Sequence, residues 1–224
     1  MVTKRTYCDG CAAAHALDLI GERWALLVVR ELLLGPKRFT SLRAGMPNPS
    51  SDVIARRLRE LQQAGVVRHR KLGPPASSWV YELTDWGMEL EPVITRLGRW
   101  GSRSPWRPRD AALGVDSLVL ALRTMFEPPA AEGFSASYEL HLGEERFHAV
   151  VDDGRFEIAR GSADRPDATI ETNPGTLAAL VFDRRQLAEA LRSGDIKIGG
   201  SREAVERFLG FFPLPEPTAF TVEV

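Results

Sequence analysis

The chain has 224 residues, 44% of them hydrophobic and 26% charged, a composition typical of soluble globular proteins and unlike that of collagen-like or disordered chains. No apolar run approaches the roughly 20 residues that cross a bilayer, and the polar start of the chain lacks the apolar core of a signal peptide, so no membrane partner is expected. The two cysteines are too few for a disulfide framework, which favours a reducing, cytoplasmic setting.

The net charge of −1 hides a strong asymmetry along the chain. Residues 1–109 carry 18 Lys and Arg against 10 Asp and Glu, a net charge of +8, whereas residues 110–224 carry 11 against 20, a net charge of −9. A basic half favours a nucleic-acid partner, although a chance segregation of solvated charge would give the same numbers. The sign changes in a stretch rich in Pro and Ser, which predicts a linker at 104–111 between two domains.

The basic half opens with a predicted helix over 12–34 that has a possible break at Gly21. Its middle is apolar almost all round, which is typical of a helix at the centre of a domain. A short strand at 37–39 and a brief helix at 40–43 are expected next. The turn at 45–49 holds two prolines and cannot continue any helix.

A second helix is predicted to begin after the cap residue Ser50 and to end near Ala64. Ile54, Leu58 and Leu61 share one face of this helix and should point inward, while the opposite face carries arginines. Two helices joined by a tight turn, with a basic outer face on the second, are typical of a helix-turn-helix, whose second helix enters the major groove of DNA.

Two strand-like runs at 66–71 and 78–83 flank a turn rich in Gly and Pro, which predicts a hairpin. Arg68, Arg70 and Lys71 near its tip would let the hairpin reach phosphates or a minor groove as a wing; the alternative is an ordinary solvated surface. The side chains predicted to contact DNA are Arg43, Ser50, Ser51, Asp52, Ala55, Arg56, Arg57, Arg59, Arg70, Lys71 and Ser77.

Thr84 is expected to cap the last helix of this half, and Pro92 is expected to kink it. The apolar stripe of this helix is longer than a domain of about 100 residues needs for its own core. We therefore predict a homodimer with two-fold symmetry; packing of the stripe against the acidic half is the alternative. The predicted dimer residues are Leu17, Trp86, Leu90, Ile94, Leu97 and Trp100.

Four ordered motifs give this half a specific resemblance to a known family. They are CAAAHALDLIGERW at 11–24, RLREL at 57–61, YELTDWG at 81–87 and PV at 92–93. Together they resemble the HxlR-type winged helix-turn-helix transcriptional regulators over about residues 7–103. The resemblance implies a DNA-binding dimer, usually a repressor, with the terminal helices at the subunit interface and a first domain at 1–103.

The chain departs from this family at the recognition helix. Pro49 stands where an aliphatic residue is common, and Asp52 stands where a lysine or a polar residue is common. A carboxylate there would repel phosphates or accept a hydrogen bond from a cytosine amino group. Which bases are read therefore stays open.

Cys8 and Cys11 form a C-x-x-C pair. A structural zinc site needs four ligands, and the sequence has no second pair, so we expect no metal and no cofactor. Many family members keep a cysteine at the position of Cys11, and some of them sense oxidants or electrophiles through it. Redox sensing through these two cysteines is therefore a hypothesis, and a small buried residue is the alternative.

The acidic half has a different organisation, in which strands and helices are segregated. A helix is predicted at 114–127, strands at 135–142, 146–151, 155–158, 168–172 and 196–198, and covering helices at 174–182, 184–193 and 201–212. Segregated strands and helices predict an α+β fold with an antiparallel sheet, so the whole chain is expected to be α+β in two domains.

This half resembles the sterol carrier protein-like domain over 112–213, followed by a tail at 214–224. The stretch LRSGDIKIGG at 191–200 and the helix ending in FLGFF at 208–212 carry the resemblance. It implies a cavity for a hydrophobic small molecule, although ordinary core packing explains most of the same residues. The predicted lining is Phe126, Phe134, Tyr138, Leu140, Phe147, Phe156, Leu180, Phe182, Phe208 and Phe212.

The predicted function is that of a DNA-binding transcriptional regulator whose second domain senses a hydrophobic small molecule. One alternative is a lipid-binding module whose winged helix serves protein assembly, and another is an enzyme that uses the rear pocket. No nucleophile–base pair or paired carboxylates are evident in the sequence, so no catalytic residue is predicted.

Overall fold

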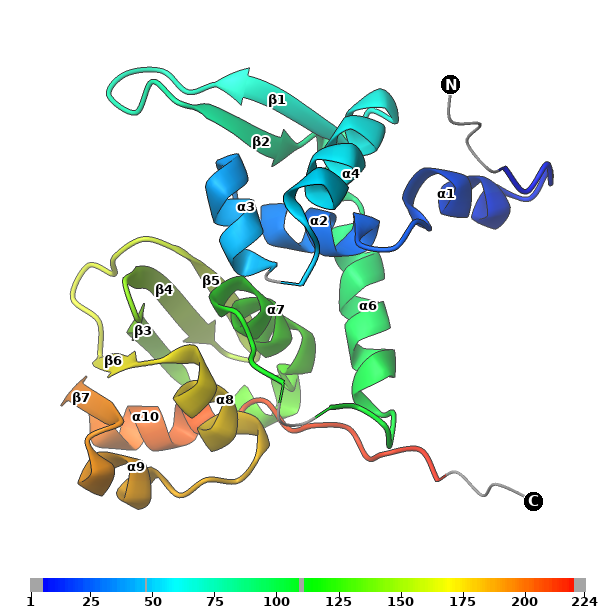
Figure 1. The fold of residues 1–224 in the computed structure, drawn as a ribbon. Helices are drawn as coiled ribbons and strands as arrows, with labels where there is room; N and C mark the ends of the chain where they lie inside the picture. The colour runs from blue at the N-terminus through cyan, green and yellow to red at the C-terminus, as the bar shows by residue number, and fades with distance from the viewer. Residues whose placement is uncertain (1–5, 47, 109–110, 220–224) are drawn as a thin grey trace. The chain divides into compact units, whose positions relative to one another are not determined.

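The computed structural model describes residues 6–46, 48–108 and 111–219 (Figure 1). The described chain divides into two compact units, Met1–Ile94 and Thr95–Val224. This division falls inside a helix, ahead of the domain boundary predicted at residue 103.

The first unit is mainly helical and carries one β-hairpin. Its elements are α1 (Ala12–Ile20), α2 (Ala25–Leu32), α3 (Phe39–Gly45), α4 (Ser51–Gln63), β1 (Val67–Lys71), β2 (Trp79–Leu83), α5 (Asp85–Met88) and the first residues of α6 (Glu91–Ser102). The expected strand at 37–39 is a single bridge between Lys37 and Tyr81. The N-cap position of α3 is Arg38, whose side chain makes no capping hydrogen bond.

Both long helices predicted for this unit are divided in the structure, the first of them at the possible break expected at Gly21. The first break separates α1 from α2, and Trp24 adopts a left-handed backbone with φ of 79° at the start of α2. The second break separates α5 from α6. Pro92 is the second residue of α6, where a missing N–H removes no helical hydrogen bond. Pro92 thus starts a new helix and does not kink a long one, which corrects the prediction.

The core of the first unit lies where α2 packs on α4. The side chains that meet there are at most 1% exposed: Val28, Val29, Leu32, Ile54, Leu58 and Leu61. The three inward positions predicted for α4 are among them. Burial of this apolar stripe fixes which face of α4 is left for solvent.

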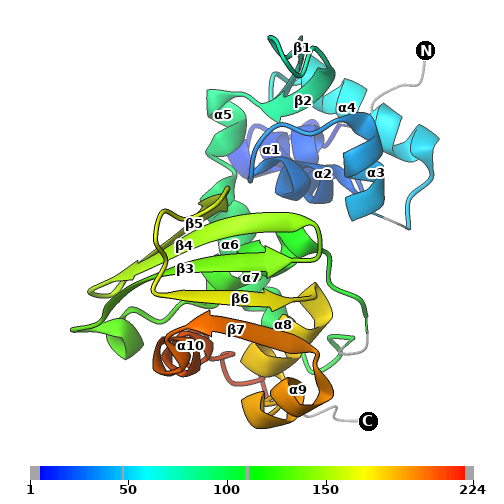
Figure 2. The same cartoon turned by 90° about the vertical axis from the view of Figure 1, so that its left-hand side faces the viewer.

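The second unit joins a five-stranded sheet to helices. Its elements are the rest of α6, α7 (Val115–Met125), the short 3-10 helix η1 (Pro128–Ala131), β3 (Ser135–Leu142), β4 (Glu145–Asp152), β5 (Arg155–Arg160), β6 (Ala168–Thr172), α8 (Pro174–Phe182), α9 (Leu187–Ser193), β7 (Ile196–Gly200) and α10 (Arg202–Leu209). Figure 2 shows the strands side by side. Their order is β5-β4-β3-β6-β7.

The sheet is mixed, which corrects the prediction of an antiparallel sheet. Strand β6 pairs with β3 in parallel, with Leu140 opposite Ile170, while the other pairs are antiparallel. The chain leaves β5 through residues 161–167 and returns beside β3. A parallel neighbour requires such a crossover, because a tight hairpin joins only antiparallel strands.

Helices of the second unit cover one face of this sheet. Helix α10 contacts β6 and β7, and α7 contacts β5. The alternate residues of β3 from Ala136 to Leu142 are buried, as predicted, but Glu139 between them is also buried at 8% exposed, so the alternation is broken at that position.

Candidate nucleic-acid interface

Helix α4 is a capped helix with one buried face and one exposed face that carries two arginines. Ser50 caps it by accepting a hydrogen bond from the backbone N–H of Val53 at 3.4 Å, and Gly65 follows its end with φ of +75°. The buried stripe of α4 leaves Asp52, Arg56 and Arg59 exposed on the outer face. A capped helix with two arginines facing solvent can approach base edges and phosphates together.

Arg57 was predicted to contact DNA, and the structure contradicts this. Its side chain is only 6% exposed and forms ion pairs with Glu60 of the same helix and with Glu22. The Nη2 atom of Arg57 lies 3.1 Å from the carboxylate of Glu22. Because its charge is already paired at the edge of the core, Arg57 holds α4 to the segment before α2.

The other predicted contact residues are all accessible to some degree. Ser51 and Ala55 are half-buried at the flank of the outer face. The remaining ones are exposed: Arg43, Ser50, Asp52, Arg56, Arg59, Arg70, Lys71 and Ser77.

A buried carboxylate that was not predicted supports the turn between α3 and α4. Glu31 is 2% exposed and lies 2.7 Å from Nζ of Lys37 and 2.8 Å from Nη2 of Arg30. A Cβ atom added to Gly45 would lie 2.2 Å from Oε2 of Glu31. Gly45 therefore lets the end of α3 pass directly over this carboxylate. A glycine before a proline-rich turn gives a hint of this, but its partner is remote in the sequence.

Strands β1 and β2 form the predicted wing, with Arg68 opposite Glu82. Nε of Arg68 and Nε of Arg70 both donate to Oε1 of Glu82, at 2.5 and 2.6 Å. These two hydrogen bonds lower the pKa of Glu82 from its ordinary value, and the bond from Arg70 contributes most. Glu82 thus stays an anion between two cations. The charge count of the wing residues predicted the cations but not this carboxylate, because its partners are known only once the two strands pair.

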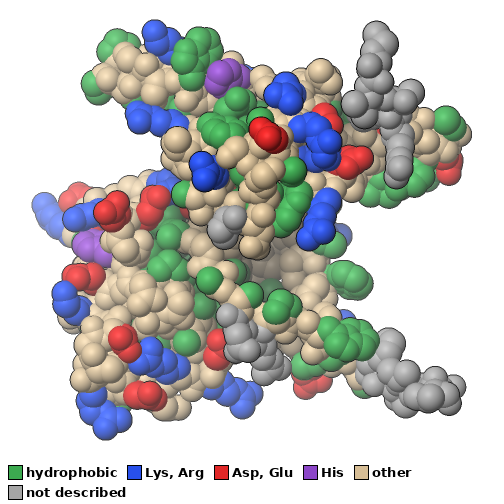
Figure 3. All heavy atoms as spheres, in the orientation of Figure 1, with side chains coloured by type: hydrophobic (Ala, Val, Ile, Leu, Met, Phe, Trp, Pro, Cys, Tyr) green, Lys and Arg blue, Asp and Glu red, His purple; other side chains and the backbone are tan. Residues whose placement is uncertain are grey.

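The wing also carries aromatic side chains beside its cations. The ring of His69 stacks on Tyr81 and on Trp79, with centroids 4.3 and 4.8 Å apart, and Trp79 is 58% exposed. Figure 3 shows Lys and Arg, hydrophobic side chains and a histidine gathered on the hairpin. The wing is therefore both cationic and aromatic.

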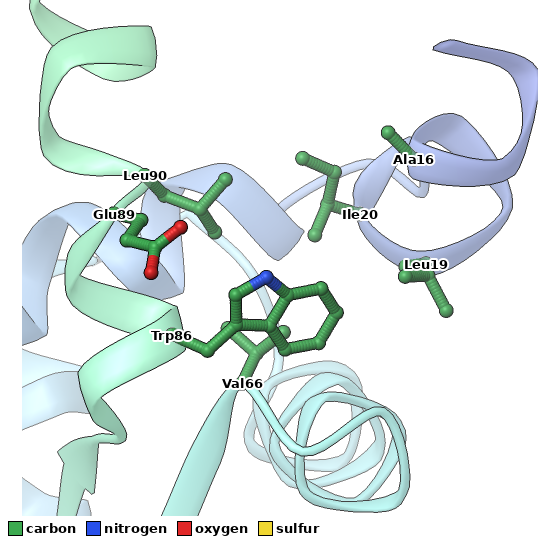
Figure 4. Close-up of a pocket in the computed structure, with 7 residues that line it drawn as sticks. All are labelled: Ala16, Leu19, Ile20, Val66, Trp86, Glu89 and Leu90. Atoms are coloured by element: carbon green, nitrogen blue, oxygen red, sulfur yellow. The ribbon is translucent and has the colours of Figure 1, made fainter. Parts of the chain in front are cut away.

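An apolar groove lies on the first unit between α1 and α5 (Figure 4). It encloses about 220 Å³ and is lined by Ala16, Leu19, Ile20, Val66, Trp86, Glu89 and Leu90. Two of the predicted dimer residues, Trp86 and Leu90, line this groove, and Leu17 of α1 is 49% exposed.

Helix α6 has no buried residue in the described chain. Leu97 is 48% exposed and Trp100 is 75% exposed, while Ile94 is half-buried. The apolar stripe that was predicted for this helix is thus present and faces solvent, as a subunit interface does in an isolated chain.

Cys8 and Cys11 are exposed free thiols. Backbone N–H groups of Ala14 and then of Ala13, in the first turn of α1, lower the pKa of Cys11 from its ordinary value. The alternative of a small buried residue is therefore wrong for Cys11. In the described chain no cluster of His, Cys, Asp or Glu could hold a metal ion, and no described helix is both long and apolar enough to cross a membrane.

The predicted lining residues of the second unit are buried or half-buried, and several of their rings pack against one another. Tyr138, Leu140, Phe147, Phe208 and Phe212 are at most 1% exposed and Leu180 is 6% exposed, whereas Phe126, Phe134, Phe156 and Phe182 are half-buried. Ring centroids of Phe212 and Phe208 lie 5.0 Å apart, and those of Phe212 and Phe156 lie 5.2 Å apart. Rings at these distances form a core through their mutual contacts.

Comparison with known proteins matches each half of the chain to a family. Residues 19–108 match the HxlR-like helix-turn-helix family, and residues 111–222 match the alkyl sulfatase C-terminal family. The second match is not to a family named for sterol carriers, so the sterol carrier resemblance stays a prediction.

Similar proteins include two regulators from Bacillus subtilis. The uncharacterized HTH-type transcriptional regulator YvaP is 36% identical over 87 residues, which are 39% of this chain and 81% of YvaP. The HTH-type transcriptional regulator YodB is 33% identical over 88 residues, which are 39% of this chain and 79% of YodB.

A solved structure is similar to the other half. The inverting sec-alkylsulfatase Pisa1 from Pseudomonas sp. is 19% identical, with a TM-score of 0.41, over 49% of this chain and 17% of that enzyme. The greater part of that enzyme thus has no counterpart here. This chain belongs to the HxlR-like helix-turn-helix family of transcriptional regulators, and its second unit belongs to the alkyl sulfatase C-terminal family.

Proposed function

We propose that this regulator binds operator DNA as a homodimer, with α4 in the major groove and the wing on the adjacent backbone, and that it represses transcription. The outer face of α4 carries the proposal. There the Ser50 cap and the buried stripe leave Arg56 and Arg59 exposed on a rigid element. The net charge of +8 over residues 1–109 favours the same partner.

The contacts are assigned by position on these elements. Residues near the start of α4, Ser51, Asp52 and Ala55, lie where a recognition helix meets base edges. Arg56 and Arg59 reach bases or phosphates, and Asp52 accepts from a cytosine amino group. The wing cations contribute phosphate contacts, which read no base directly but fix the register of the protein on the duplex.

Fluorescence anisotropy with an operator selected from a random duplex library tests this proposal. Arg56→Ala and Arg59→Ala should each weaken binding by about 1–3 kcal/mol and relax specificity if a bidentate base contact is lost. Arg192→Ala removes an equally charged and exposed side chain from α9 and serves as the matched control. Duplex binding that does not weaken as sodium chloride is added would refute the proposal.

The dimer is proposed from the apolar surface of α5 and α6. Three apolar residues there are largely exposed: Trp86 at 51%, Leu97 at 48% and Trp100 at 75%. The groove between α1 and α5 offers space for side chains of a second copy. Sedimentation velocity at micromolar concentration should give a dimer for the wild type and a monomer for Leu97→Glu. Val150→Glu, at a site 39% exposed on the sheet, should remain a dimer. A monomeric wild type would contradict the proposal.

The second unit is proposed to bind a hydrophobic small molecule. The resemblance of residues 112–213 to the sterol carrier protein-like domain supports this assignment, and a ligand would have to part rings that pack against one another in this structure. A ligand alters operator affinity only when it binds the DNA-competent and incompetent states differently, and typical coupling is about 1–3 kcal/mol. Native mass spectrometry of the purified chain should reveal a bound apolar molecule, or thermal shift should identify one among fatty acids and alkyl sulfates. No binding in either assay would refute the assignment.

A redox response through Cys11 is a second candidate function. The exposure of this thiol and its lowered pKa favour reaction with oxidants, since the thiolate is the reactive form. Hydrogen peroxide, which converts one thiolate to a sulfenic acid and releases water, should change operator affinity of the wild type and of Cys8→Ser, but not of Cys11→Ser. An unchanged response in Cys11→Ser would exclude this role.

A further inference from the structure

We propose that Glu82 is a positioning residue for DNA binding, which holds Arg68 and Arg70 as one pre-oriented pair aimed at the phosphate backbone. This inference rests on the proposed DNA-binding function of the wing and deepens it. Glu82 is an anion within a cationic surface, so net charge alone would predict that its carboxylate weakens DNA binding.

The geometry distinguishes the pair from ordinary surface arginines. One oxygen, Oε1 of Glu82, accepts from Nε of both arginines. The carboxylate side chain is 9% exposed, whereas the side chains of Arg68 and Arg70 are 57% and 44% exposed. The anchor is therefore buried and the two guanidinium groups reach out from it.

The Nε atoms of Arg68 and Arg70 bond to Glu82, which leaves the Nη donors of both side chains for a phosphate. Each guanidinium carries five N–H donors in a planar fork, and Nε supplies only one of them. Both bonds use Nε as the donor, and in the described chain neither arginine donates a hydrogen bond from a Nη atom. The outer Nη edges are thus left for bidentate contact with phosphate oxygens.

The strand register explains how one carboxylate serves two arginines. Arg68 lies directly opposite Glu82, and Arg70, two residues on, lies opposite Val80 on the same face of the hairpin. Directly opposed and diagonal side chains lie within reach of each other on an antiparallel pair. The clamp therefore depends on the hairpin, and it orients the cations before DNA arrives.

Two physical effects of Glu82 oppose each other when DNA binds. Its negative charge weakens attraction of any duplex, through long-range electrostatics. Its hydrogen bonds order two flexible side chains before DNA arrives. Binding therefore avoids an ordering cost that would lower the affinity by a factor of about 2 to 12 for each side chain. The first effect acts on all duplexes alike, whereas the second acts only where both guanidinium groups meet phosphates in a defined register.

The test compares Glu82→Gln with the wild type on the selected operator and on a scrambled duplex, by anisotropy at a fixed salt concentration. We expect operator affinity to fall on the order of tenfold, although the substitution removes one negative charge from the protein. Affinity for the scrambled duplex should stay equal or rise. Operator binding as tight as that of the wild type, with an unchanged ratio between the two duplexes, would overturn the inference.

Two controls separate positioning from folding and from charge. Glu139→Gln neutralises a carboxylate of similar burial in the second unit, 8% exposed and bonded to His141 and Arg146, and should leave the operator-to-scrambled ratio unchanged. In an Arg68→Ala/Arg70→Ala background, Glu82→Gln should have no further effect on that ratio. A further loss in this background would mean that Glu82 acts only on hairpin stability, and the inference would fall.

The failure of this inference is distinguishable from failure of the proposed function. A wild-type chain that does not bind duplex in a salt-dependent way refutes DNA binding itself. A wild type that binds the operator, together with a Glu82→Gln variant of unchanged preference, refutes only the positioning role.

Discussion

Replacing Gly45 by alanine should destabilise the chain, although alanine is the better helix former. Gly45 is the last residue of α3, and the added Cβ would lie 2.2 Å from Oε2 and 2.9 Å from Cδ of Glu31. The carboxylate would have to move by more than 1 Å to reach ordinary van der Waals contact, at about 3.5 Å. Lys37 and Arg30 hold it at 2.7 and 2.8 Å in a site where Glu31 is 2% exposed.

The magnitude follows from two opposing contributions. Alanine gains at most about 1 kcal/mol over glycine in a helix. Disrupting a buried ion pair costs about 3–5 kcal/mol. The expected net loss is therefore about 2–4 kcal/mol, which is enough to lower the melting temperature of a domain of about 100 residues by roughly 8 °C or more.

Differential scanning calorimetry of the full chain measures this shift, and a Glu31→Ala background supplies the control. With no carboxylate left to displace, Gly45→Ala should there raise stability, by up to about 1 kcal/mol. A change of sign between the two backgrounds is the expected signature of the clash. A stabilising Gly45→Ala in the wild type, or an equal loss in both backgrounds, would refute the reasoning.

Three further outcomes follow from the described contacts. Phe212→Ala should lower the free energy of unfolding by about 3–5 kcal/mol in urea titrations, because its buried ring is part of the aromatic core; a loss below 1 kcal/mol would mean that the ring borders open space. A hydrogen bond with His141, followed by the N–H of Ala163, lowers the pKa of Glu139 below its ordinary 4.5. Ionised Glu139 therefore contributes stability above about pH 4.5, and this stability is lost as the pH falls through the lowered folded-state pKa. In Glu139→Gln, the midpoint of urea unfolding should depend less on pH over this acidic range. Maleimide at pH 7 should label Cys11 in Cys8→Ser faster than a model peptide thiol, because its pKa is lowered; equal rates would contradict that shift.

Helix α4 shows what local sequence information can predict. Its Ser50 cap, its apolar spacing of three and four and its closing glycine are features of consecutive residues, and each agrees with the structure. The hairpin and the strands of the second unit follow from equally local patterns of alternation and turn residues. The presence and type of these elements could therefore be predicted.

Pairings between distant residues could not be predicted in this way. Arg57 belongs to the same basic run as Arg56 and Arg59, but it forms an ion pair with Glu22, which lies 35 residues earlier in the chain. The parallel pairing of β3 with β6 likewise depends on where a crossover returns. A residue's own neighbours in sequence carry no information on such partners.

The candidate site likewise has features that local sequence predicts and features that depend on tertiary contacts. Local patterns placed cations on a helix and a hairpin, because charge and period are properties of short segments. The anchoring of two of those cations by Glu82, the carboxylate under Gly45 and the mutual packing of the phenylalanines arise only when separate segments meet in space. Burial and hydrogen bonding depend on all the neighbours of a side chain, and most of those neighbours are brought together by folding.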